Sequence, residues 1–122
     1  MLMRRLIIVA AIGAASIGVA AADENEPLKE LDTGAYAEVA KRPNPRRLIL
    51  QHVPALTALL LAAERKKGTA LTKTEVEFLR DIGTVMVVDS EGARAVEAQR
   101  GYKDIDPAQV WVEWQSLRSQ LK

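Results

Sequence analysis

The sequence contains no cysteine and a single histidine, His52, and aromatic residues make up only 4% of its 122 residues. Without cysteine the chain has no disulfide, no lipid-modified cysteine and no thiol nucleophile. A single histidine cannot form a zinc site of the Cys/His type. No Gly-x-Ser-x-Gly motif is present either. We therefore predict a protein that is not an enzyme and that holds no cofactor and no metal ion.

The sequence also lacks an excess of either charge. It has 17 Lys and Arg against 16 Asp and Glu, which gives a net charge of +1 at pH 7. Proteins that bind nucleic acid or an anionic membrane surface usually carry a basic face. The balanced composition therefore predicts no nucleic-acid partner.

The N-terminus has the order of features that is typical of a secretory signal peptide. Arg4 and Arg5 precede an apolar run over residues 6–19, and three alanines end at Ala22 before the acidic Asp23. This order predicts cleavage between Ala22 and Asp23 and a periplasmic or secreted mature protein. The alternative is an uncleaved inner-membrane anchor, although the run is shorter than the roughly 20 residues that span a bilayer. Membrane contact is expected only in that case.

Three segments follow from this interpretation: a signal peptide at 1–22, a polar lead-in at 23–47 and a helical domain at 48–122. Pro27, Pro43 and Pro45 interrupt the lead-in, which we expect to be partly flexible. Its basic segment, residues 41–47, is predicted to be a solvated hinge. The alternative for this segment is contact with lipid headgroups or an acidic partner.

Residues 48–122 carry several helix signals. The apolar stretch 48–63 predicts a central core helix that becomes regular near Pro54 and ends at Gly68. Thr72 with Glu75 forms the pattern of a capping box at a second helix start. Asp106 followed by Pro107 marks the start of the last helix, with Gln109 in the reciprocal role.

A shorter helix is expected between these two. Asp89 or Ser90 can cap it, and Arg100 with Gly101 can end it. The β-branched residues 84–88 favour a short extended segment, but no partner strand is evident. The sequence therefore predicts a mostly α fold, a small single-domain bundle of about four helices, with 84–88 as an extended connector.

The C-terminal half also resembles a group of small uncharacterised bacterial proteins. The resemblance rests on Leu71-Thr72, Arg80-Asp81, Arg100-Gly101-Tyr102, Asp104-Ile105-Asp106-Pro107, Trp111 and Glu113-Trp114-Gln115. No established activity goes with this group. The resemblance implies a bacterial origin and a shared helical half, and it assigns no functional residue.

The candidate interaction surface is an aromatic corner formed by Tyr102, Trp111 and Trp114. Core packing is the competing interpretation, because a domain with few aromatics tends to bury its tryptophans. We predict an exported protein-interaction or accessory module whose partner is an envelope protein. The alternatives are a membrane-anchored helical module and a small hydrolase that uses carboxylates, for which Asp104 and Asp106 are the nearest pair in the sequence.

Overall fold

The computed structural model describes residues 25–120, so the predicted signal peptide and the cleavage site between Ala22 and Asp23 lie outside the described residues. Its elements are β1 (Thr33–Ala35), α2 (Tyr36–Val39), β2 (Ile49–His52), α3 (Leu56–Lys67), α4 (Lys73–Ile82), β3 (Thr84–Val88), α5 (Ser90–Arg100), the 3-10 helix η3 (Pro107–Gln109) and α6 (Val110–Gln120). Within this part of the chain, no helix combines the length and the apolar character needed to cross a bilayer.

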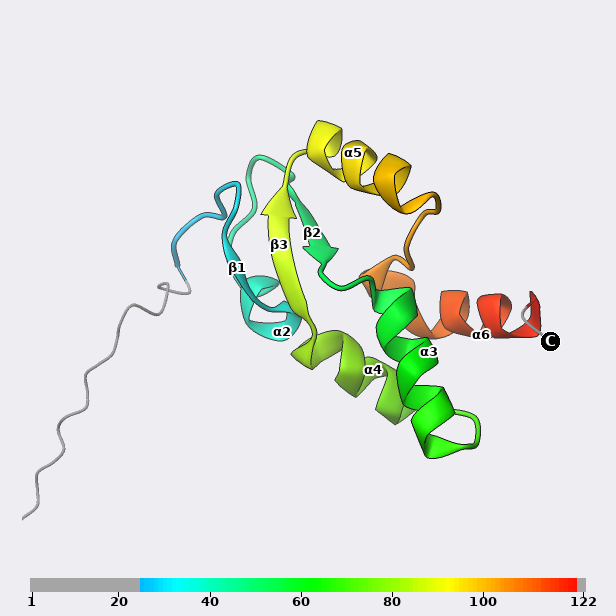
Figure 1. The fold of residues 1–122 in the computed structure, drawn as a ribbon. Helices are drawn as coiled ribbons and strands as arrows, with labels where there is room; N and C mark the ends of the chain where they lie inside the picture. Colours follow the sequence, from blue (N-terminus) through cyan, green and yellow to red (C-terminus); the bar gives the residue numbers. More distant parts are fainter. Residues whose placement is uncertain (1–24, 121–122) are drawn as a thin grey trace, which may run out of the picture.

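The three strands form one antiparallel sheet in the order β1-β3-β2 (Figure 1). Its central strand, β3, buries Val85 and Val87 completely, while Thr84 is exposed and Met86 and Val88 are half-buried. This alternation matches the two-residue period of a strand. Residues 84–88 are therefore the centre of the sheet rather than an unpaired connector.

The prediction of a mostly α bundle of about four helices is wrong, because the domain is a mixed α/β fold with a three-stranded sheet. The partners of β3 come from two segments that precede it by more than 30 residues. One is the three-residue strand β1, and the other is β2, at the beginning of the stretch that we expected to lead into the core helix. Neither partner has the length or the composition that would identify a strand from sequence alone.

The predicted start of α4 and both predicted ends of α5 are confirmed, whereas Asp106 caps the 3-10 helix η3 and α6 begins only at Val110. Thr72 and Glu75 form the complete capping box of α4, and the N–H of Gly92 donates to Asp89 at the start of α5. Gly68 and Gly101 end α3 and α5 in the left-handed conformation, with φ of 83° and 85°. This conformation is open to glycine because it has no Cβ.

Two hydrophobic clusters stabilise the fold. The helical cluster lies where α3, α4 and α6 meet, below the sheet in Figure 1, and its buried members are Leu56, Leu60, Leu71, Val76, Ile105, Val110 and Trp114. The sheet cluster covers one face of β3 and consists of Leu28, Val39, Leu48, Val85 and Val87. Its first three members come from residues 28–48, so most of the expected lead-in is part of the folded domain.

The basic segment 41–47 is also tied to the domain. Arg42 is buried, donates to the backbone carbonyls of Glu26 and Pro27, and pairs with Asp32 at 2.9 Å. The side-chain amide of Asn44 bonds both the N–H and the C=O of Leu48. Because Arg42 is buried and paired, it is not a solvated cation.

Candidate functional site

The structure separates the three aromatic residues of the predicted interaction surface. Tyr102 is 43% exposed, Trp111 packs half-buried against the helical cluster, and Trp114 is fully buried within that cluster. Of the three, Tyr102 therefore has the largest exposed fraction available to a partner. Trp114 occupies the core position that the competing interpretation assigned to it.

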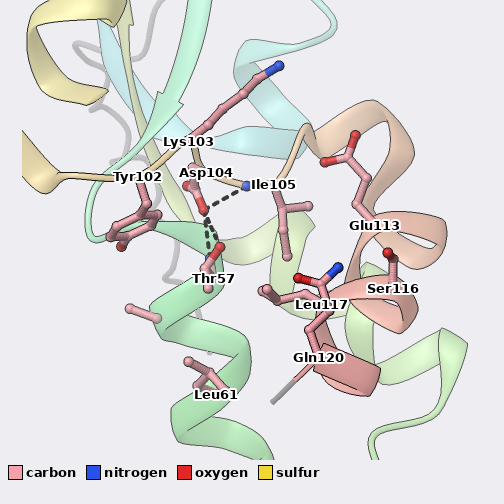
Figure 2. Close-up of a pocket in the computed structure, with 11 residues that line it drawn as sticks. Thr57, Leu61, Tyr102, Lys103, Asp104, Ile105, Glu113, Ser116, Leu117 and Gln120 are labelled. Atoms are coloured by element: carbon pink, nitrogen blue, oxygen red, sulfur yellow. Dashed lines mark hydrogen bonds between the residues drawn. The ribbon is translucent and has the colours of Figure 1, made fainter. Parts of the chain in front are cut away.

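Tyr102 lies at the edge of a groove of about 640 Å³ between α3 and α6 (Figure 2). The α3–α6 groove has an apolar floor and polar groups around it. The apolar lining consists of Ala58, Leu61, Ile105 and Leu117. The polar lining includes Lys103, Glu113, Ser116 and Gln120, and Asp104 and Thr57 lie at the end nearest the start of α3.

Asp104 organises that end of the groove by capping α3 from a distant part of the sequence. The residue before α3 is Ala55, whose side chain cannot cap. Asp104 instead accepts hydrogen bonds from the backbone N–H groups of Leu56, at 2.7 Å, and Thr57, at 2.8 Å. Asp104 also accepts hydrogen bonds from the hydroxyl of Thr57 and from the backbone N–H of Ile105. A negative charge at a helix N-terminus also interacts favourably with the helix dipole.

Arg100 connects this cap to the sheet. Its Nη2 donates to the C=O of His52 at 2.8 Å, and its Nη1 lies 3.6 Å from Asp104 Oδ2. Nη1 is buried and has no hydrogen-bond partner in residues 25–120. Arg100 therefore holds together the end of α5, the end of β2 and the segment that caps α3.

The carboxylates around the groove already have structural partners. Glu113 accepts the N–H of Asp106 at 2.8 Å, and Asp106 caps η3 by accepting the N–H of Ala108. The reciprocal bond expected of Gln109 is thus made by Glu113. Asp104 and Glu113 line the same groove, but both are engaged in helix starts. In the described part of the chain, no three His, Asp or Glu side chains are grouped to hold a metal ion.

His52 is buried between the sheet and α4 and is 2% exposed. Its ring stacks on Tyr36 with the centroids 5.4 Å apart, and its Nε2 donates to the C=O of Arg80 at 3.0 Å. Because a carbonyl only accepts, this bond places the ring proton on Nε2. Burial lowers the pKa of His52 below its ordinary value of 6.5, so the ring is neutral at pH 7. These contacts give His52 a structural role.

Sequence reasoning missed the α3–α6 groove and the role of Asp104. The cap joins residues 47 and 48 positions apart, so no local spacing indicates it. One indirect signal is present. The stretch before α3 offers no Ser, Thr, Asp or Asn at the helix start, so a cap had to come from another part of the chain.

Comparisons with protein-family models, with curated proteins and with solved structures find no match to this chain.

Proposed function

We propose that the chain is an exported, non-catalytic interaction module of a bacterial envelope, and that it binds a partner protein at the surface around Tyr102. The N-terminal sequence pattern supports export, and the surface of the folded domain supports the interaction. The segment 102–105 is central to it, because these four residues line both the α3–α6 groove and a second groove beside β2.

The observation that carries the proposal is the exposed ring of Tyr102 at the junction of the two grooves. Tyrosine is enriched among residues that dominate binding energy, because it supplies a large apolar area together with a polar tip. An apolar floor with polar groups around it is also the usual anatomy of a protein interface. A partner that covers Tyr102 would bury that floor.

The export half of the proposal is tested by intact mass and N-terminal sequencing of protein from a bacterial periplasmic fraction. We expect a product that begins at Asp23, with 15 basic and 16 acidic residues and a net charge of −1. A full-length product in the membrane pellet would contradict cleavage and support the anchored alternative.

The interaction half is tested by placing the photo-crosslinking residue p-benzoylphenylalanine at position 102 in cells. Position 112 is the matched control, because Val112 is 64% exposed on α6 but lines neither groove. We expect a defined crosslinked protein from position 102 and none from position 112. Equal crosslinking from both positions would contradict a binding surface around Tyr102.

A further inference from the structure

The outer edge of β2 has one open position for a backbone partner. In the register of β2 against β3, Leu50 lies opposite Val87, and the N–H of Val53 donates to the C=O of Thr84 at 2.9 Å. Backbone bonding alternates along an antiparallel strand. Because Val53 bonds toward β3, Gln51 and Ile49 do so as well, and Leu50 and His52 turn their N–H and C=O groups away from β3.

The opposite side of β3 supports this assignment independently. The N–H of Val87 donates to the C=O of Asp32 at 2.8 Å, and the C=O of Val87 accepts the N–H of Leu31 at 2.7 Å. Both backbone groups of Val87 therefore point toward β1, and neither is free to bond Leu50. Outside the pairing of β2 with β3, no hydrogen bond in residues 25–120 uses the N–H or the C=O of Leu50. The alternation described above leaves both groups unpaired within that pairing as well.

Side chains occupy three of the four outward backbone groups on either side of Leu50: both groups of Leu48 and the C=O of His52. At one end, the amide of Asn44 accepts the N–H of Leu48 at 2.8 Å and donates to its C=O at 2.7 Å, as a neighbouring strand would. At the other end, Arg100 donates to the C=O of His52. Edge strands are commonly protected in such ways. Here the protecting side chains bond Leu48 and His52 but not Leu50, so the N–H and the C=O of Leu50 remain available.

A groove of about 430 Å³ lies along this edge and is lined by residues of β2 and α5. We call it the β2–α5 groove. Strand β2 forms one wall, the α5 residues Ala93, Glu97 and Arg100 lie along another, and the segment 102–107 closes the end near α3. Tyr102 lines this groove as well as the α3–α6 groove. Space for a chain segment is therefore present next to the unpaired backbone groups.

We propose that the β2–α5 groove binds an extended segment of a partner protein, which pairs its backbone with Leu50 and adds a short strand to the sheet. An extended segment presents an N–H and a C=O side by side, and these complement the two open groups of Leu50. A helix cannot do so, because its backbone groups are bonded internally. This inference rests on the proposed function and specifies the conformation of the partner at the same surface.

The first experiment places p-benzoylphenylalanine at position 97, which lines the β2–α5 groove, and at position 91 as the control. Glu97 and Glu91 are both exposed glutamates of α5, and Glu91 lines none of the grooves described here. We expect position 97, and not position 91, to crosslink the protein that position 102 captures. The crosslinked site should map to one contiguous partner segment.

The second experiment measures binding of a synthetic peptide with the sequence of that segment to the full mature protein. Each peptide residue is N-methylated in turn, which removes one donor at a time. Strand addition predicts that methylation at the residue opposite Leu50 weakens binding roughly five- to tenfold, since a net hydrogen bond contributes about 1 kcal/mol. Methylation of the residues next to it, whose N–H groups face away from β2, should have little effect.

The outcomes separate this inference from the proposed function. Capture at position 102 without capture at position 97 would overturn strand addition and leave the interaction module standing. Tolerance of N-methylation at every peptide residue would overturn it too, because binding would then depend on side chains alone. Absence of capture at both positions would contradict the interaction module together with the inference.

Discussion

At the scale of single residues, Asp104 and Asp106 differ in the number of hydrogen bonds they accept and in their burial. Asp104 accepts four hydrogen bonds and is largely buried, whereas the exposed Asp106 caps η3 with one bond. Removing an acceptor from buried donors costs more than removing it from donors that water can reach. The two aspartates, which are close in sequence, should therefore differ clearly in their effect on stability.

We predict that Asp104→Ala lowers the free energy of unfolding by about 3 kcal/mol, since it removes a helix cap and leaves buried N–H groups unpaired. Asp106→Ala is the matched control and should cost about 1 kcal/mol. Urea denaturation of both variants measures the difference. Equal losses would show that the contacts of Asp104 with α3 do not matter for stability.

His52 should make stability depend on pH. Because burial lowers its pKa in the folded state, the unfolded chain binds a proton more readily below the ordinary value of 6.5. The stability that comes from the neutral ring is complete above pH 6.5 and is lost as the pH falls from 6.5 toward the lower folded-state pKa. Asp32 and Glu75, whose pKa values are also lowered, lose their contributions at more acidic pH.

We predict that the free energy of unfolding decreases between pH 7.5 and pH 5 and that His52→Gln removes most of this decrease. Glutamine retains an N–H that can donate to the C=O of Arg80 and does not titrate. Urea denaturation at several pH values provides the measurement. A variant with the same slope as the native protein would assign the pH dependence to other groups.

At the scale of elements, α5 differs from the other long helices because none of its residues is fully buried. Beneath it lies the β2–α5 groove rather than a packed core. Helices with few buried apolar contacts open at low free energy. The element that forms one wall of the proposed strand site is therefore also the helix best able to move when a segment enters.

We predict that native-state hydrogen exchange is faster in α5 than in β3 or α3. The backbone amides of β3 are central in the sheet, and α3 buries Leu56 and Leu60. The measurement is exchange followed by mass spectrometry or NMR. Protection of α5 equal to that of β3 would mean that α5 opens only when the whole domain unfolds.

The elements also show what the sequence can and cannot reveal. The starts of α4 and α5 were predictable, because Thr72, Glu75 and Asp89 bond within their own helical turn. The sheet was not, because β3 finds its partners far away in the chain and β1 is only three residues long. The same limit applies to the candidate site, where Tyr102 was identified as an aromatic but the grooves depend on the tertiary fold.

At the scale of the whole molecule, each end of the described chain contributes to a hydrophobic cluster. The N-terminal part supplies the sheet cluster and the C-terminal part supplies the helical cluster. Leu28 and Val39 complete the sheet cluster, and Trp114 completes the helical one. The domain therefore begins well before Leu48, where the helical domain was expected to start.

We predict that a chain beginning at Leu48 does not fold cooperatively, since it lacks β1 and the buried side chains of residues 28 and 39. A chain beginning at Asp23 is the control and should show a single cooperative transition. Thermal unfolding followed by circular dichroism distinguishes them. Equal midpoints for the two chains would show that residues 23–47 contribute little to stability.

The strand order β1-β3-β2 has a consequence for the timing of folding. The central strand is the last of the three in the sequence, and a ribosome or an export channel delivers the chain from its N-terminus. Until Val88 has emerged, β1 and β2 have no strand to pair with. Most of the chain must therefore be delivered before the sheet can form, so the residues that precede β3 remain without their central strand until late in synthesis.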